Sequence, residues 1–112
     1  MSDTINSESP IGKRLSKIKK PKDLSLCFDG KTFPIICQIT IGRDRKNTIR
    51  VDDSFTSKQH ALIQKIKDAY FIKDLNSTNG TYLNDQLMEK DKYYKLKKND
   101  RIRIGKTEIV IQ

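Results

Sequence analysis

The sequence predicts an all-β fold, a β-sandwich in which two twisted sheets pack face to face. Short apolar segments rich in Ile, Val, Phe and Tyr recur between clusters of Asn, Asp, Gly and Lys, as expected of strands joined by turns. No long run with the 3.6-residue period of an amphipathic helix interrupts them. Packing two sheets against each other would bury the apolar face of each, so a sandwich is the expected architecture.

Ten strands are expected from the residue pattern, and turn residues bound most of them. Asp29-Gly30 accepts positive φ at a two-residue hairpin turn, so a hairpin opens the domain. The segment from Gln38 to Gly42 alternates apolar and polar residues with the period of a half-buried strand. The expected strands cover residues 24–28, 32–37, 38–42, 49–51, 61–66, 70–75, 81–83, 95–96, 101–104 and 108–111.

The chain of 112 residues has room for one domain of ordinary size and a short tail. Residues 1–22 mix Ser, Pro, Gly and Lys with few apolar residues, and they carry six Lys or Arg against two acids. Such a segment buries too little apolar surface to offset the entropy of ordering it. We expect residues 1–22 to form a flexible basic tail and residues 23–112 to form the domain.

The formal net charge of +9 comes from 23 Lys and Arg against 14 Asp and Glu. A field of this sign attracts polyanions such as nucleic acid, anionic membranes, and phosphorylated or acidic protein segments. Charge alone does not distinguish these partners. No apolar segment approaches the length of a membrane span, so a membrane is not expected among them.

Cys27 and Cys37 lack the spacing of a zinc knuckle or of a C-x-x-C redox site, and two cysteines are too few for a disulfide scaffold. We expect both to be buried free thiols, because Cys packs like a small hydrophobic residue. Free thiols, together with an N-terminus that lacks the apolar stretch of a signal peptide, indicate an intracellular location. The expected compartment is the cytoplasm, or the nucleus in a eukaryote.

Three loops hold polar side chains that packing does not explain. Arg43 offers a planar fork of donors that matches phosphate oxygens bidentately. The hydroxyl groups of Ser57 and Thr78 can donate hydrogen bonds to the same anion. The amide of Asn79 can both donate hydrogen bonds to a peptide backbone and accept them from it. The loops contain Gly42-Arg43, then Ser57-Lys58-Gln59-His60, then Asp74-Leu75-Asn76-Ser77-Thr78-Asn79-Gly80-Thr81. The pattern predicts an anion-binding site with a cationic fork and neutral donors.

The same loops offer no catalytic pair of nucleophile and base. Asp44, Asp52 and Asp53 lack the spacing of a calcium loop or of a paired general acid and base. The segment 105–107, Gly-Lys-Thr, ends like a P-loop, but Asp100 stands where that motif needs glycine, so a hairpin turn is expected. We expect no enzymatic activity, no cofactor and no metal site.

In order and spacing, these motifs resemble those of the forkhead-associated (FHA) domain. Gly-Arg is followed about fourteen residues later by Ser-x-x-His, then seventeen residues later by Ser-Thr-Asn-Gly-Thr, and near the end by Asn-Asp-x-Ile-x-Ile-Gly. The resemblance covers about Leu24 to Gln112. It implies an eleven-stranded β-sandwich of antiparallel or mixed sheets. It also implies a signalling adaptor that docks proteins phosphorylated on threonine by a Ser/Thr protein kinase.

The resemblance implies a role for each residue that matches a binding position of the family. Arg43 falls where the arginine pairs with the phosphate, and Ser57 and Thr78 fall on two further phosphate contacts. Asn79 matches the asparagine that bonds the backbone of the bound peptide. Lys58 follows Ser57 at a variable position, where it is a further candidate for phosphate contact.

Other matching residues are expected to support the site without touching the ligand: Gly42, His60, Gly80, Thr81 and Asn84. The counterpart of His60 braces the binding loops by hydrogen bonds and transfers no proton. Phe55 departs from the family pattern, because some relatives place a polar or cationic group there, toward the third residue after the phosphothreonine. The preference at that peptide position is therefore left open.

The alternative function is a basic nucleic-acid-binding β module. It is favoured by the net charge and by Arg101 and Arg103, which equally fit a solvated edge strand that discourages aggregation. Readers of nucleic acid usually offer exposed aromatic side chains for stacking. Tyr70, Phe71 and Tyr82 lie instead in strands that need core residues. Nucleic acid is therefore not expected among the partners.

An intramolecular partner is a further expectation. Thr4 lies in an acidic segment suited to a kinase, and some FHA domains fold a phosphorylated tail threonine onto their own binding face. The twenty residues from Thr4 to Leu24 extend to about 60–70 Å, enough to reach any face of the domain. Phosphorylated Thr4 would then compete with an external peptide. The other interpretation is a tail that adds only charge and solubility.

Overall fold

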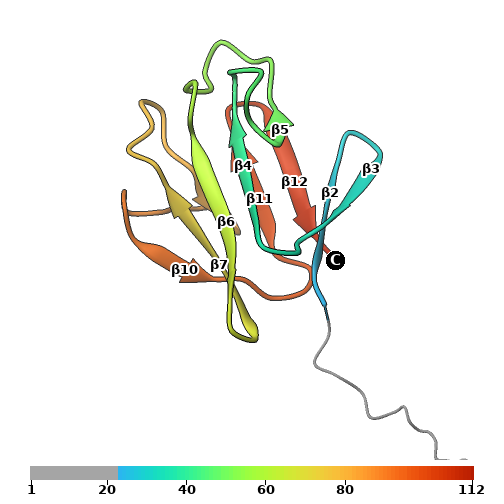
Figure 1. The fold of residues 1–112 in the computed structure, drawn as a ribbon. Helices are drawn as coiled ribbons and strands as arrows, with labels where there is room; N and C mark the ends of the chain where they lie inside the picture. The colour runs from blue at the N-terminus through green and yellow to red at the C-terminus, as the bar shows by residue number, and fades with distance from the viewer. Residues whose placement is uncertain (1–22) are drawn as a thin grey trace, which may run out of the picture.

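The computed structural model describes residues 23–112, which form a β-sandwich of two sheets (Figure 1). These residues contain eleven strands, five in one sheet and six in the other, and no helix. The predicted all-β sandwich is therefore confirmed. Among residues 23–112 there is no helix long and apolar enough to cross a membrane. The expectations for the tail 1–22, including the docking of phosphorylated Thr4, lie outside the described residues.

The five-stranded sheet has the order β10-β7-β6-β4-β5. Neighbouring strands in it are antiparallel except β4 and β5, which run parallel. The parallel pair sets Gly42 beside Arg50 at the end of both strands. The strands are β4 (Gln38–Gly42), β5 (Ile49–Arg50), β6 (Ala61–Ile66), β7 (Ala69–Asp74) and β10 (Tyr93–Lys95).

The six-stranded sheet has the order β3-β2-β12-β11-β8-β9 and is antiparallel throughout. Its first and last strands come from opposite halves of the domain, and the C-terminal strand β12 lies between β2 and β11. The strands are β2 (Ser25–Phe28), β3 (Lys31–Pro34), β8 (Tyr82–Leu83), β9 (Gln86–Leu87), β11 (Arg101–Ile104) and β12 (Thr107–Ile111).

The buried apolar side chains of both sheets form one core cluster. Inward and outward residues alternate along each strand, so Ile102 and Ile104 of β11 are fully buried while Arg101 and Arg103 are exposed. The core is mainly aliphatic, and isoleucine dominates it. Its buried members are Leu24, Leu26, Ile35, Ile39, Ile41, Ile49, Val51, Ala61, Ile63, Tyr70, Ile72, Met88, Leu96, Ile102, Ile104, Ile109 and Ile111.

Two hairpin turns follow the sequence prediction. Asp29 and Gly30 both have positive φ, 53° and 73°, which is the conformation of a type I′ turn between β2 and β3. Gly105 has a φ of 59° at the first central position of the β11–β12 turn. The segment 105–107 is therefore a hairpin turn that leads into β12, as expected, and not part of a P-loop.

Several strand boundaries differ from the prediction. The strand β9, Gln86–Leu87, has no counterpart among the ten expected strands, because both of its residues are exposed and lack an apolar alternation. The strand expected over 32–37 ends at Pro34, since proline has no N–H to continue a ladder. The strand expected at 95–96 is β10, which covers Tyr93–Lys95.

The burial of both cysteines was predicted wrongly. Cys27 is only half-buried, because it pairs with Thr32 and Val110 on the outer face of the six-stranded sheet. Cys37 is exposed in the bend between β3 and β4. Both are free thiols within the described residues. The β-strand period, rather than the hydrophobicity of Cys, decides which face each side chain takes.

The predicted environments of the aromatic and arginine side chains also need correction. Only Tyr70 belongs to the core, whereas Phe71 and Tyr82 are half-buried on the outer faces of the sheets. Arg103 lies over the Tyr82 ring at 4.3 Å from its centroid. Its strand β11 is an inner strand between β8 and β12, so Arg101 and Arg103 belong to a solvated face and not to a solvated edge.

The two faces of β6 give a direct test of this packing. Ile63→Ala is expected to lower the free energy of unfolding by about 2–5 kcal/mol, because it leaves a cavity at a fully buried position. The control is Ile66→Ala in the same strand, where the side chain is 41% exposed and the expected change is within about 1 kcal/mol. Denaturant unfolding of both variants measures the difference. Equal losses would contradict the assignment of the inner face.

Candidate functional site

The three loops that hold the predicted site residues are joined by backbone hydrogen bonds at one end of the sandwich (Figure 1). They connect β4 to β5, β5 to β6, and β7 to β8. The N–H of Arg43 in the first loop donates to the C=O of Ser57 in the second at 3.0 Å. The N–H of Leu75, where the third loop begins, donates to the C=O of His60 at 2.9 Å. The second loop therefore ties the other two together.

His60 connects the second and third loops through its side chain, which is fully buried. Its Nδ1 accepts the backbone N–H of Ser57 at 3.0 Å. Because that N–H can only donate, Nδ1 carries no proton, and the neutral ring has its proton on Nε2. Nε2 then donates to the C=O of Gly80 at 2.9 Å. The imidazole is a buried bridge whose tautomer is fixed by its two partners.

Asp74 organises the third loop from its buried position at the end of β7. Its Oδ1 accepts the hydroxyls of Ser77 and Thr81, both at 2.6 Å, and its Oδ2 accepts the N–H of Ser77 at 2.9 Å. Burial disfavours the charged carboxylate and is the largest single influence on its pKa. The hydrogen bonds from Ser77 and Thr81 together outweigh burial, so the pKa of Asp74 lies below its usual value of 3.8.

Asp53 fastens the second loop to the β11–β12 turn, which comes from the other sheet. Its Oδ2 accepts the backbone N–H of Lys106 at 2.9 Å, and its Oδ1 accepts the N–H of Phe55 at 2.8 Å. These two hydrogen bonds hold the pKa of the Asp53 carboxyl below its usual range, and the bond from Lys106 has the larger effect. Lys106 also lies over the ring of Phe55, with its Nζ 5.9 Å from the centroid.

Arg43, Ser57 and Thr78 are brought together by this framework. The Nε of Arg43 donates to the C=O of Thr56 at 3.1 Å, and its terminal nitrogens have no hydrogen-bond partner within residues 23–112. Ser57 Oγ accepts the backbone N–H of Thr78 at 3.1 Å, which leaves the Ser57 hydroxyl proton available to donate. Thr78 itself is exposed in the third loop. A cationic fork and neutral donors therefore lie on adjoining loops.

Lys58 and Asn79 flank this group, and both are exposed. Asn79 Nδ2 donates to the C=O of Phe55 at 3.0 Å, which fixes the amide and leaves its Oδ1 without a partner in the described part of the chain. Gly42 allows the first two loops to approach, because a Cβ there would collide with the C=O of Lys58 and lie 2.7 Å from Asn47 Nδ2. Any larger residue would push these loops apart.

The remaining supporting candidates fall in two places. Gly80 has a φ of 89° and presents its C=O to His60, and Thr81 is the buried partner of Asp74. Asn84 lies away from the three loops. It bonds Asp100 and the N–H of Arg101 at the start of β11, whereas the end of β11 leads to the turn that contacts Asp53.

Sequence reasoning missed several residues that shape the site. Asp53 has no motif around it in the sequence, yet it joins two loops that are far apart in the sequence. Asn47 donates to the C=O groups of both Asp44 and Lys58. The bond between Asp74 and Ser77 could have been predicted from the sequence, because an Asp three residues before a Ser often closes a turn with its side chain. The long-range bonds of Asp53 and Asn47 have no such local pattern.

A β-sandwich that displays a cationic fork and neutral donors on joined loops defines an anion-binding interaction module. The sequence profile of the FHA domain matches residues 39–105, which is more than half of the chain. The chain therefore belongs to the FHA domain family, and the domain is a binding module. This confirms the family resemblance, and the matched segment contains every predicted site residue.

Two curated relatives illustrate the similarity at the level of sequence. Protein FraH of Nostoc sp. is 36% identical over 59 residues, which are 53% of this chain and 20% of FraH. Smad nuclear-interacting protein 1 of Mus musculus is 35% identical over 79 residues, covering 58% of this chain and 21% of that protein. The chain thus matches about a fifth of the length of these relatives.

A solved structure extends the similarity to the fold. The MEK1 FHA domain, solved in complex with a phosphothreonine peptide of HOP1, superposes with a TM-score of 0.74 at 29% identity. The alignment covers 82% of this chain and 97% of that domain.

Replacing Asp74 with Asn tests the network under the third loop. Asp74→Asn is expected to lower the free energy of unfolding at pH 7 by about 1–3 kcal/mol, because an amide has only one accepting oxygen where the carboxylate has two. Its NH₂ group then faces either the N–H of Ser77 or the hydroxyls of Ser77 and Thr81, and those donors lose their acceptor. The pKa of Asp74 in the folded state lies below the ordinary value of 3.8. The stabilisation by its carboxylate is therefore fully present above pH 3.8, and it is lost as the pH falls through the lower folded-state pKa.

The difference between the wild type and this variant should therefore shrink as pH falls below 3.8, and unfolding curves at several pH values measure it. Asp68→Asn, in the exposed turn between β6 and β7, is the matched control and should leave stability unchanged. If Asp74→Asn were as stable as the wild type at pH 7, the network would contribute nothing to the fold.

Proposed function

We propose that the domain binds protein segments that contain phosphothreonine, through the loops at the end of the sandwich. The observation that carries this function is the convergence of Arg43, Ser57 and Thr78 on adjoining loops. A phosphate offers oxygens that accept a bidentate arginine and several neutral donors at once. Arg43 would pair with the phosphate, and the hydroxyl groups of Ser57 and Thr78 would donate hydrogen bonds to it. Lys58 would add a second positive charge.

Asn79 would position the peptide beside the phosphate. Its amide is held by the C=O of Phe55, and its Oδ1 faces no partner within residues 23–112, so it can accept a backbone N–H of the ligand. Because the site is prearranged by buried contacts, little ordering of the loops would oppose binding. The phosphothreonine peptide bound by the MEK1 FHA domain supports a ligand of this class.

In this function the domain acts as a signalling adaptor that docks partners after a Ser/Thr protein kinase has phosphorylated them. We propose an intracellular location, in the cytoplasm or a eukaryotic nucleus, where such marks are written and where an exposed thiol such as Cys37 stays reduced. We also propose that the domain catalyses no reaction. Its one histidine, His60, has both ring nitrogens bonded to backbone groups and none left for a substrate.

One observation favours the alternative function, nucleic-acid binding. Phe71 and Tyr93 lie on the outer face of the five-stranded sheet, with Lys73 close by. These rings contact each other edge to face at 6.1 Å, and Lys73 Nζ lies 4.8 Å from the Tyr93 centroid. The proposed phosphate contacts Arg43, Ser57 and Thr78 lie on the loops at the end of the sandwich and not on this face. Phosphopeptide binding remains the function that the geometry supports best.

Calorimetric titration of matched peptides tests the proposal. A threonine-phosphorylated peptide selected from an oriented library should bind, its unphosphorylated form should not, and the phosphoserine form should bind about fivefold more weakly because it lacks a methyl group. Arg43→Ala should weaken binding at least about tenfold, because charge-assisted hydrogen bonds are lost.

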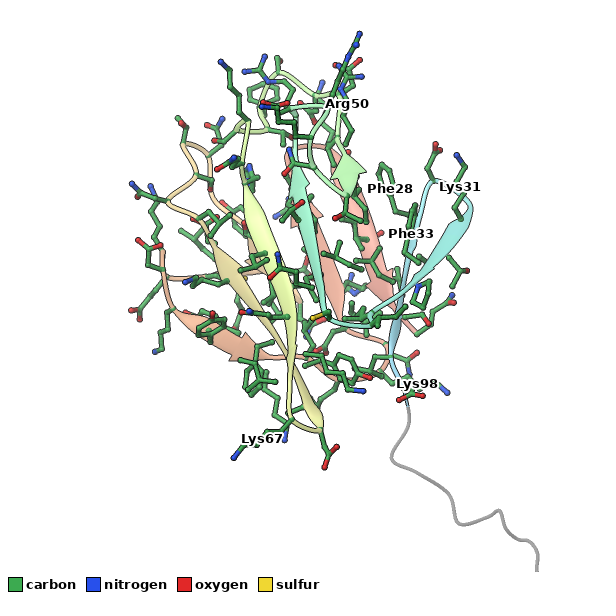
Figure 2. All side chains as sticks on the ribbon, in the orientation of Figure 1. Phe28, Lys31, Phe33, Arg50, Lys67 and Lys98 are labelled. Carbon is green, nitrogen blue, oxygen red and sulfur yellow. The ribbon has the colours of Figure 1, made fainter. Side chains whose placement is uncertain are left out.

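Lys98→Ala is the control for this experiment, since it removes the same charge at the opposite end of the domain (Figure 2). It should bind the peptide as the wild type does. Affinity that ignores phosphorylation but falls steeply with salt would instead identify a binder of nucleic-acid backbones. Equal affinity of Arg43→Ala and the wild type would refute the assignment of Arg43.

A further inference from the structure

Next to Arg43 there is a concavity of about 200 Å³ that the proposed function does not explain. Arg43 and Lys58 form one part of its lining, and Arg50, at the end of β5, forms another. Asp44 and Asp52 complete the lining. Figure 2 shows Arg50 among the loops at this end of the sandwich. Every residue that lines it is charged, and cations outnumber carboxylates around it.

The first loop concentrates positive charge beyond what one phosphate requires. Between residues 43 and 50 there are four cations, Arg43, Arg45, Lys46 and Arg50, against the single acid Asp44. Like charges so close together repel one another, and the repulsion is relieved when an anion lies among them. Asp44 gives limited relief, because it supplies one negative charge against four positive ones.

Arg50 is held in a position to bind a second anion. The parallel pairing of β4 and β5 sets it beside Gly42, and its Nε donates to the C=O of Arg43 at 3.0 Å. This bond fixes the start of the guanidinium group and leaves the terminal nitrogens for other partners. One of them lies 3.5 Å from Asp52, whose side chain is 77% exposed. An ion pair this exposed is weak and is easily exchanged for a ligand anion.

We propose that Arg50, with Lys58, forms a second anion subsite beside the phosphate contact of Arg43. The domain would then prefer phosphothreonine segments that carry another anionic group close to the phosphothreonine, either an acidic side chain or a second phosphate. This inference rests on the proposed function, since the subsite lies beside the phosphate that Arg43 would hold. It adds Arg50 as a residue that determines specificity but is not needed for the first phosphate.

Three pools of phosphothreonine peptides test this subsite on the full chain. In the first pool the three residues on each side of the phosphothreonine are neutral, in the second one of them is Glu, and in the third one is phosphoserine. The wild type should bind the second or third pool at least about fivefold more tightly than the first. Arg50→Ala should remove this preference and keep the affinity for the neutral pool within about twofold.

Lys98→Ala, which lowers the net charge equally at the opposite end of the domain, should keep the preference. A preference for the phosphoserine pool alone identifies doubly phosphorylated segments, and a preference for both charged pools identifies acidic ones. Equal binding of the three pools by the wild type, or a preference that survives in Arg50→Ala, would overturn the subsite while leaving the proposed function intact. Failure of every pool to bind would remove the proposed function and this inference together.

Discussion

The buried imidazole of His60 is the contact on which the arrangement of the binding loops depends. Nδ1 accepts the N–H of Ser57, the first residue of the Ser-x-x-His motif, and Nε2 donates to the C=O of Gly80 in the Ser-Thr-Asn-Gly-Thr motif. Two motifs separated in the sequence are thereby held at a fixed distance. Because the ring is fully buried, any loss of either bond would leave an unpaired polar group inside the protein.

Further contacts extend this constraint outward to the surface. Asp74 sets the turn that carries Thr78 and Asn79, and Asp53 joins the second loop to the opposite sheet. Arg43 is held by the C=O of Thr56, so the exposed donors rest on backbone groups that the core positions. An anion would meet donors that are already in place, which is how a small domain with exposed loops achieves a selective site.

The parts of this structure that depend on local sequence were predictable, and those that depend on distant partners were not. Asp29-Gly30 favours a hairpin turn by itself, and the alternation of apolar and polar residues in β4 determines which face of that strand is buried. The strand β9 was missed because its two residues are exposed and carry no pattern. The partners of Asp53 lie across the sandwich, and Arg50 has the pattern of an ordinary strand residue until its pairing beside Gly42 is known.

The tautomer of His60 is the most direct measurement of the central constraint. A long-range ¹H–¹⁵N NMR spectrum of the free domain at pH 7 reports the protonation of each ring nitrogen. The structure predicts a single neutral form with the proton on Nε2 and an unprotonated Nδ1 that accepts the Ser57 N–H. A proton on Nδ1, or a ring that exchanges between both tautomers, would contradict the bridge between the loops and with it the account of a prearranged site.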